Sequence, residues 1–208
     1  MTPAMTKSVW GARIRLAAAI VLLTGTMSCG DLTRQGQASS YLIVASLEAT
    51  SGADPGAFST VLSSDVVTLV DDVPSVFADP ARVTLTIGMK DAGSTGSPST
   101  PTIVNRITVD RYHVSYVRAD GRNTPGIDVP YPFDGAFTAT VSSGETTAGF
   151  ILVRLQAKEE APLKALAFGP TVISTIAEIT FYGHDQTGRE VSVTGRMDVH
   201  FANFADPQ

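Results

Sequence analysis

The residue types that most often carry out catalysis or bind transition metals are few and widely spaced in this sequence. The three histidines, His113, His184 and His200, lie too far apart for a local zinc motif such as H-E-x-x-H. The single cysteine, Cys29, lies near the N-terminus, and no G-x-S-x-G nucleophile elbow is present. A hydrolase would have to bring Ser, His and Asp together from distant segments. We therefore predict no catalytic residue, no cofactor and a protein that is not an enzyme.

Aspartates in predicted connections are the better candidates for metal binding, because calcium takes about six to eight oxygen ligands, often from loops. Two groups of three are present: Asp71, Asp72 and Asp79, and Asp120, Asp128 and Asp134. The sequence has no D-x-[DN]-x-[DN]-G loop, and aspartate is also a common turn residue. We expect no metal site, with Asp71, Asp72 and Asp79 as the alternative.

A proline-rich and aromatic segment, residues 123–135 (NTPGIDVPYPFDG), is the candidate binding loop. Its prolines restrict the backbone, so little ordering entropy is lost when a partner binds. The candidate contact residues are Ile127, Asp128, Tyr131, Phe133 and Asp134. In the alternative interpretation, Tyr131 and Phe133 cap the end of the hydrophobic core.

The N-terminus has the pattern of a secretory signal peptide. Lys7, Arg13 and Arg15 precede an apolar stretch, 16–23, that is shorter than the roughly 20 residues needed to span a bilayer. Small residues follow, and the chain then reaches Cys29. We expect residues 1–28 to be removed and the rest to be exported.

The segment Thr26-Met27-Ser28-Cys29 resembles the lipobox of bacterial lipoproteins, although Thr26 and Met27 depart from its usual residues. The resemblance implies a lipid on Cys29 and a membrane-anchored protein that faces the periplasm or the cell surface. The alternative is cleavage by an ordinary signal peptidase and a soluble secreted protein.

Residues 29–40 lack apolar periodicity and are predicted to be the lipidated cysteine and a flexible tether, which as an eleven-residue coil from Gly30 spans about 17–20 Å. Residues 41–208 are the predicted domain. Removing residues 1–28 takes away three basic residues and no acidic ones, so 12 Lys plus Arg face 20 Asp plus Glu, a formal net charge of −8. Such a charge disfavours a nucleic-acid partner.

From Tyr41 onward, apolar residues alternate with polar ones, which is typical of half-buried strands. Eight strands are predicted, at 41–49, 65–70, 82–90, 106–118, 133–141, 149–156, 175–184 and 190–201. Gly195 interrupts one apolar row and predicts a bulge. The apolar phase changes within 107–117, which indicates a bulge or a strand that passes between two sheets. Residues 158–166 predict a short helical crossover between the sheets, in which Leu163 and Leu166 lie three residues apart.

The segment 178–191 (EITFYGHDQTGREV) resembles the closing hairpin of bacterial immunoglobulin-like domains, in which a D-x-x-G-N type turn joins the last two strands; here Arg189 stands in place of Asn. The resemblance extends to Phe201 and implies a sandwich used for scaffolding or binding. The predicted fold is an all-β, immunoglobulin-like antiparallel β-sandwich of about eight strands with one short helical crossover.

These observations predict a non-enzymatic envelope lipoprotein that acts as a binding or scaffolding module. Its partners are then the membrane, through an N-terminal lipid, and an envelope protein or glycan. The alternatives are a calcium-dependent or carbohydrate-binding sandwich and, third, a secreted hydrolase.

Overall fold

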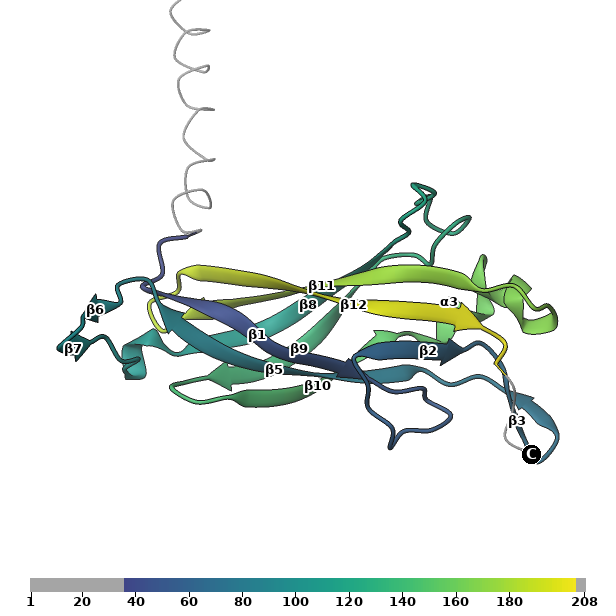
Figure 1. Cartoon of the computed structure of the whole chain (residues 1–208), viewed down its shortest axis with the longest axis horizontal. Coiled ribbons are helices and arrows are strands. Elements are labelled where there is room, and N and C mark those ends of the chain that lie inside the picture. Colours follow the sequence, from purple (N-terminus) through teal and green to yellow (C-terminus); the bar gives the residue numbers. More distant parts are fainter. Residues whose placement is uncertain (1–35, 205–208) are drawn as a thin grey trace, which may run out of the picture.

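Two β-sheets packed face to face form the domain. The computed structural model describes residues 36–204, which fold as an all-β sandwich (Figure 1). One sheet has three strands, in the order β1 (Ser40–Ala49), β5 (Asp79–Met89) and β10 (Thr146–Val153). The other has five, in the order β2 (Val61–Asp65), β12 (Glu190–Ala202), β11 (Ile173–Asp185), β8 (Ile107–Val117) and β9 (Phe133–Val141).

The strand order is that of an immunoglobulin-like sandwich, which confirms the predicted fold class. In the usual lettering, β1, β5 and β10 correspond to strands A, B and E, and β8, β11 and β12 to strands C, F and G. The described strands of the two sheets pair antiparallel, with the exception of β2, which runs parallel to β12.

Short elements close the two ends of the sandwich. The end where the described chain begins, which we call the proximal end, carries residues 36–39, 90–106, 142–145 and 186–189. It includes the hairpin of β6 (Gly93–Ser94) and β7 (Ser97–Pro98) and the 3-10 turn η1 (Ile103–Asn105). The distal end carries residues 66–78, 118–132 and 154–172, at the right of Figure 1. It includes the hairpin of β3 (Thr68–Val70) and β4 (Val73–Ser75), the helix α3 (Leu155–Glu159) and the 3-10 helix η2 (Leu163–Phe168).

The core lies between the sheets and contains both aliphatic and aromatic side chains. Tyr112 and Tyr116 on β8 point inward, and their hydroxyls donate to the carbonyl oxygens of Ile151 (3.1 Å) and Leu152 (2.6 Å) in the opposite sheet. Burial raises the pKa of both phenols, because the charged form would lose its hydration. The two hydroxyls therefore satisfy buried polar atoms and link the sheets.

The phase change predicted in the β8 region is a β-bulge. The register of β8 shifts at Asp110 against both neighbouring strands, so Val109 faces the core while Asp110 and Arg111 both face outward. The bulge predicted at Gly195 was wrong. Gly195 lies in an unbroken register opposite Ile179, and it faces Leu47 and Val44 of β1.

Two predicted elements are divided in the structure. The strand predicted at 65–70 is two strands, β2 and β3, with a turn between them where Val66 is buried and its N–H donates to the carbonyl of Ala202 (2.9 Å). The helical segment predicted at 158–166 is also two elements, α3 and η2, which meet around Pro162. Leu163 and Leu166 are buried.

The domain begins before the boundary predicted at Tyr41. Ala38 and Ser40 are buried, and the amide of Lys90 donates to the carbonyl of Ser39 (3.0 Å). The Lys90 Nζ also donates to the carbonyl of Gly36 (2.5 Å). The part of the predicted tether that the structure describes is therefore docked on the proximal end, and its remainder, with Cys29 and the signal peptide, lies outside the described residues.

The hairpin predicted between the last two strands is present, and Asp185 organises it. Its Oδ1 accepts hydrogen bonds from the amide and hydroxyl of Thr187 (2.8 and 2.6 Å) and from the amide of Arg189 (3.0 Å). Gly188 takes a positive φ of 78°, which the turn requires. Burial alone raises the pKa of Asp185, but these hydrogen bonds outweigh it and hold the pKa below the usual value.

We expect Asp185→Asn to lower the free energy of unfolding by about 1 kcal/mol at neutral pH, because the amide keeps the shape and loses the charge-assisted hydrogen bonds. A lowered carboxyl pKa stabilises the fold above the unfolded pKa of about 4, and this contribution is lost as the pH falls. Denaturant unfolding of both proteins near pH 7 and near pH 3 checks this. The difference between them should shrink at the lower pH, and a constant difference would count against the assignment.

Candidate functional site

Large apolar side chains that face water are present at both ends of the domain. Among residues 36–204, seven such side chains are at least half exposed. Five lie at the distal end: Val73 (60%), Ile127 (71%), Tyr131 (50%), Phe168 (96%) and Val172 (51%). The other two, Ile103 (69%) and Val104 (56%), are neighbours at the proximal end. Single exposed apolar residues are common, whereas groups of them mark interaction surfaces. The distal five, which we call the apolar apex, are the main candidate binding surface.

The predicted binding loop contributes to the apolar apex, but its two aromatic rings differ in burial. Phe133 is 8% exposed, and its ring packs against the edge of Tyr112 with 6.1 Å between centroids. Tyr131 is half exposed and lies over Gly126, where a side chain would collide with its ring. Phe133 therefore caps the core, as the alternative interpretation has it, while Ile127 and Tyr131 remain available for contact.

The two carboxylates of the loop are engaged locally. Asp128 Oδ2 accepts a hydrogen bond from the amide of Thr124 (3.2 Å) and so stabilises the loop itself. Asp134 Oδ1 lies 3.2 Å from His113 Nδ1 and 3.6 Å from Arg111 Nη1. Asp134 consequently belongs to the outer face of the five-stranded sheet.

Phe168 is the most exposed residue of the apolar apex. The turn that contains it is held in place by hydrogen bonds and by a buried neighbour. Leu166 in the same turn is buried, and its carbonyl accepts a hydrogen bond from the amide of Gly169 (3.3 Å). The side chain of Asn203 donates to the carbonyl of Ala167 (2.7 Å). Sequence reasoning missed Phe168; the available signal was its position outside the buried stripe of this short helical segment.

The two ends of the domain differ in their balance of acidic and basic residues. Among the charged residues of the distal segments and of the positions next to them, those that are not buried are mostly acidic: Asp65, Asp71, Asp72, Asp120, Asp128, Glu159 and Glu160, against Arg118, Arg122, Arg154 and Lys164. The other two, Asp79 and Lys158, are buried. The proximal segments and their flanking residues are balanced: Asp91, Glu145 and Glu190, against Lys90, Arg106 and Arg189. The distal end, which carries the apolar apex, therefore has a small excess of acidic side chains.

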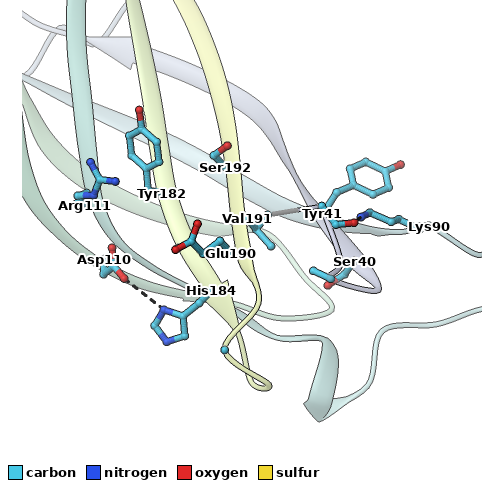
Figure 2. Close-up of a pocket in the computed structure, with 14 residues that line it drawn as sticks. Ser40, Tyr41, Lys90, Asp110, Arg111, Tyr182, His184, Glu190, Val191 and Ser192 are labelled. Atoms are coloured by element: carbon cyan, nitrogen blue, oxygen red, sulfur yellow. Dashed lines mark hydrogen bonds and ion pairs between the residues drawn. The ribbon is translucent and has the colours of Figure 1, made fainter. Parts of the chain in front are cut away.

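A polar groove of about 660 Å³ crosses the five-stranded sheet near the proximal end, between the start of the described chain and the β11–β12 hairpin (Figure 2). His184 Nδ1 lies 3.3 Å from Asp110 Oδ2, and the guanidinium of Arg111 lies 3.9 Å from the ring centroid of Tyr182. The bulge in β8 creates this arrangement, because it turns Asp110 and Arg111 to the same face.

The side chains of Asp110 and His184 are about half exposed, at 54% and 47%. Water therefore reaches the pair and weakens its electrostatic effect on any bound molecule. Among the described residues, the polar groove is thus a hydrated surface of mutually paired charges rather than a dry pocket.

The third histidine is also on the outer face of the five-stranded sheet. His200 Nδ1 lies 3.0 Å from the hydroxyl of Ser174. His113, His184 and His200 are on three different strands, each beside a different oxygen-bearing side chain. Within residues 36–204, no group of three or more His, Cys, Asp or Glu side chains is placed to hold a metal ion.

The aspartates named as calcium candidates do not converge. Asp71 and Asp72 form the exposed turn of the β3–β4 hairpin, with φ of 51° and 62°, whereas Asp79 is fully buried at the start of β5. Asp120 binds Arg118 and Arg122 at 2.6 and 2.9 Å. The hydrogen bond from the Arg118 side chain, followed by that from the Arg122 amide, holds the pKa of Asp120 well below its usual value.

Asp79 belongs to a buried ion pair that the sequence did not reveal. Lys158 Nζ donates to Asp79 Oδ1 (2.7 Å) and to the carbonyl of Asp65 (2.7 Å), and the two ion-pair side chains are 1% and 0% exposed. Asp79 also accepts hydrogen bonds from the hydroxyl of Ser64 (2.6 Å) and the amide of Gly52 (2.9 Å). The pair fixes α3 to β5 and to the end of β2.

Burial governs the protonation of both partners. Loss of hydration raises the pKa of Asp79 and lowers the pKa of Lys158, while the mutual attraction of the two groups offsets part of each shift. A paired and hydrogen-bonded arrangement of this kind has a structural role, which is to hold the distal elements in place.

Comparison with known proteins finds no matching family model and no similar curated protein. Within residues 36–204, none of the helices has the length and apolar character to cross a bilayer.

Proposed function

We propose that this protein is an exported, lipid-anchored binding module, without enzymatic activity, whose contact surface is the apolar apex. The observation that carries the proposal is the position of that surface. The segments 118–132 and 154–172, which contain Ile127 and Phe168, lie toward the end of the sandwich opposite to the one where the described chain begins (Figure 1). A lipid on Cys29 would hold the proximal end near a membrane and direct the apolar apex away from it.

The chemistry of the apolar apex points to a protein partner with an apolar and basic surface. Exposed aliphatic and aromatic side chains such as Ile127 and Phe168 favour binding when a partner removes them from water. The binding free energy becomes more favourable by about 25 cal/mol per Å² of apolar area buried. The surrounding carboxylates favour lysine and arginine on the opposing surface and repel nucleic acid.

The polar groove supports the non-enzymatic part of the proposal. Catalytic groups act most strongly where water is excluded and where their charges are free to stabilise a transition state. In the groove, Asp110 is paired with His184, and Arg111 is stacked on Tyr182, on an open surface. This is the arrangement of a solvated sheet face.

We expect Phe168→Ser to leave stability within about 0.5 kcal/mol of the native protein, because the side chain is 96% exposed. Leu166→Ala, in the same turn, is the matched control: its side chain is 4% exposed, so its loss should cost about 2 to 4 kcal/mol. Thermal and denaturant unfolding of the two variants checks both values. A large destabilisation by Phe168→Ser would mean that the ring packs into the fold and is not a contact residue.

Site-specific photocross-linking in the native envelope tests the proposal. A photoreactive phenylalanine analogue at position 168 should give a discrete adduct with one protein. The same analogue at Thr138, an exposed position on β9, should not. Raising the salt concentration should weaken the adduct, since part of the attraction is electrostatic. Equal adducts at both positions, or none at position 168, would reject the apolar apex as the contact surface.

A further inference from the structure

We propose that the proximal end of the domain rests on the lipid bilayer, with Ile103 and Val104 inserted at the level of the phospholipid head groups. This inference rests on the proposed lipid anchor at Cys29. It begins from the second group of exposed apolar side chains, which consists of these two neighbours in η1.

The turn that carries Ile103 and Val104 is rigid. Asn105 is buried, and its Oδ1 accepts hydrogen bonds from the amide (2.9 Å) and the hydroxyl (2.7 Å) of Thr102. The amide of Asn105 donates in turn to the carbonyl of Thr102 (3.1 Å). Because the turn is already ordered, little conformational entropy is lost when its two apolar side chains enter an interface.

The same turn is tied to the first described residues of the chain. Asn105 Nδ2 donates to the hydroxyl of Ser39 (2.7 Å), and the hydroxyl of Ser40 donates to the carbonyl of Asn105 (2.9 Å). The exposed pair therefore lies beside the point where the chain enters the domain from the direction of Cys29.

The length of the preceding chain limits how far this end can be from the membrane. Seven residue steps separate Cys29 from Gly36 in the sequence. A fully extended chain of that length spans at most about 25 Å. If Cys29 carries the lipid, the proximal end must stay within that distance of the bilayer surface. The 13-residue strand β12 alone extends about 40 Å toward the other end. The domain is therefore longer than the segment that would connect it to the lipid.

The groups around the pair fit a phospholipid interface. Ile103, Val104, Arg106, Ser142 and Ser143 line a shallow hollow of about 490 Å³ between η1 and the β9–β10 turn. Aliphatic side chains enter the boundary between head groups and acyl chains, and a guanidinium beside them binds phosphate with paired hydrogen bonds.

Charge favours the same orientation. Bacterial envelope membranes contain anionic lipids, which repel carboxylates near their surface. The distal end has an excess of carboxylates that are not buried, whereas the unburied charges of the proximal segments and their flanking residues balance. An upright domain with η1 on the bilayer places the acidic end farthest from the anionic head groups.

The test uses the acylated mature protein, reconstituted into vesicles of phosphatidylethanolamine and phosphatidylglycerol. In the variant Ile103→Cys, an environment-sensitive fluorophore is attached to the new thiol, since the Cys29 thiol is blocked by the lipid. Phe168→Cys with the same fluorophore is the matched control at the distal end. Both positions are exposed, so both variants should fold. Vesicles that contain nitroxide-labelled lipids then report which probe touches the bilayer.

We expect the probe at position 103 to shift to shorter wavelength and to be quenched by the nitroxide lipids several-fold more than the probe at position 168. If the protein floats with the vesicles and the probe at 103 is not quenched, the inference is overturned while the anchor stands. If the protein carries no lipid and does not float, both the anchor and the inference are rejected. A shift at 103 that appears without vesicles and grows with protein concentration would assign the pair to self-association and overturn the inference.

Discussion

Replacing Lys158 with methionine is expected to lower the free energy of unfolding by about 3 to 5 kcal/mol at neutral pH. Methionine fills a similar volume but removes the cation that lies 2.7 Å from Asp79. The carboxylate then remains buried, with the Ser64 hydroxyl and the Gly52 amide as its remaining donors. For a domain of this size, a loss of that order lowers the thermal midpoint by about 10 °C. Equilibrium unfolding in denaturant measures the change.

The matched control is Arg196→Met, which breaks an ion pair of similar length on the surface. Arg196 Nε lies 2.8 Å from Glu178 Oε1, and the two side chains are 69% and 33% exposed. Such a pair contributes less than about 1 kcal/mol. Equal losses in the two variants would show that the Lys158 pair is no more important to the fold than an exposed one.

The Lys158→Met variant should also respond differently to pH. Burial already raises the pKa of Asp79 in the native protein, where Lys158 offsets part of the shift. Without the lysine the pKa rises further, so the folded variant holds a proton that the unfolded chain releases above about pH 4. A raised carboxyl pKa makes stability fall as the pH rises. The free energy of unfolding of the variant should therefore fall further below that of the native protein as the pH rises from about 4 to 7.

Adding one methyl group at Gly183 should destabilise the fold by at least about 2 to 3 kcal/mol. A Cβ at this position would meet the carbonyl oxygen of Thr108 and lie 2.8 Å from the Cα of Val109, both of which are backbone atoms. Gly183 faces the bulge in β8, where the chain bends toward β11. The backbone has to move to accept Gly183→Ala, and the polar groove above the bulge would change with it.

Gly195→Ala is the control for that substitution, on the neighbouring strand β12. Its Cβ would lie 3.4 Å from Leu47 and 3.5 Å from Val44, which is ordinary packing against side chains. Alanine also costs less backbone entropy than glycine within a strand. We expect Gly195→Ala to be neutral or to stabilise by up to about 1 kcal/mol. If both variants lose several kcal/mol of unfolding free energy, the expectation that only Gly183 lacks room for a side chain is wrong.

The fold was predictable where polar and apolar residues alternate regularly. In β12 the inward positions Met197, Val199 and Phe201 are buried, and the outward ones from Glu190 to Asp198 are exposed, as the alternation predicts. The phase change in β8 was also readable, because two successive polar residues, Asp110 and Arg111, follow an apolar one. A glycine within a strand pattern, by contrast, does not by itself identify a bulge, and at Gly195 the register with β11 is unbroken.

The candidate site was only partly predictable, because exposure depends on tertiary packing. Tyr131 and Phe133 are two residues apart and similar in chemistry, yet one is half exposed and the other is buried against Tyr112. Asp79 resembled a loop carboxylate, since its partner Lys158 is 79 residues away along the chain. Local patterns do not contain such contacts.

The proposed lipid anchor on Cys29 is best tested by the intact mass of the mature protein, purified from the membrane fraction of its natural host. If the protein is a lipoprotein, we expect a chain that begins at Cys29 and carries the added mass of a diacylglycerol with or without a further acyl group. A mature chain with an unmodified Cys29 thiol, or one cleaved at a different residue and recovered in soluble form, would contradict it.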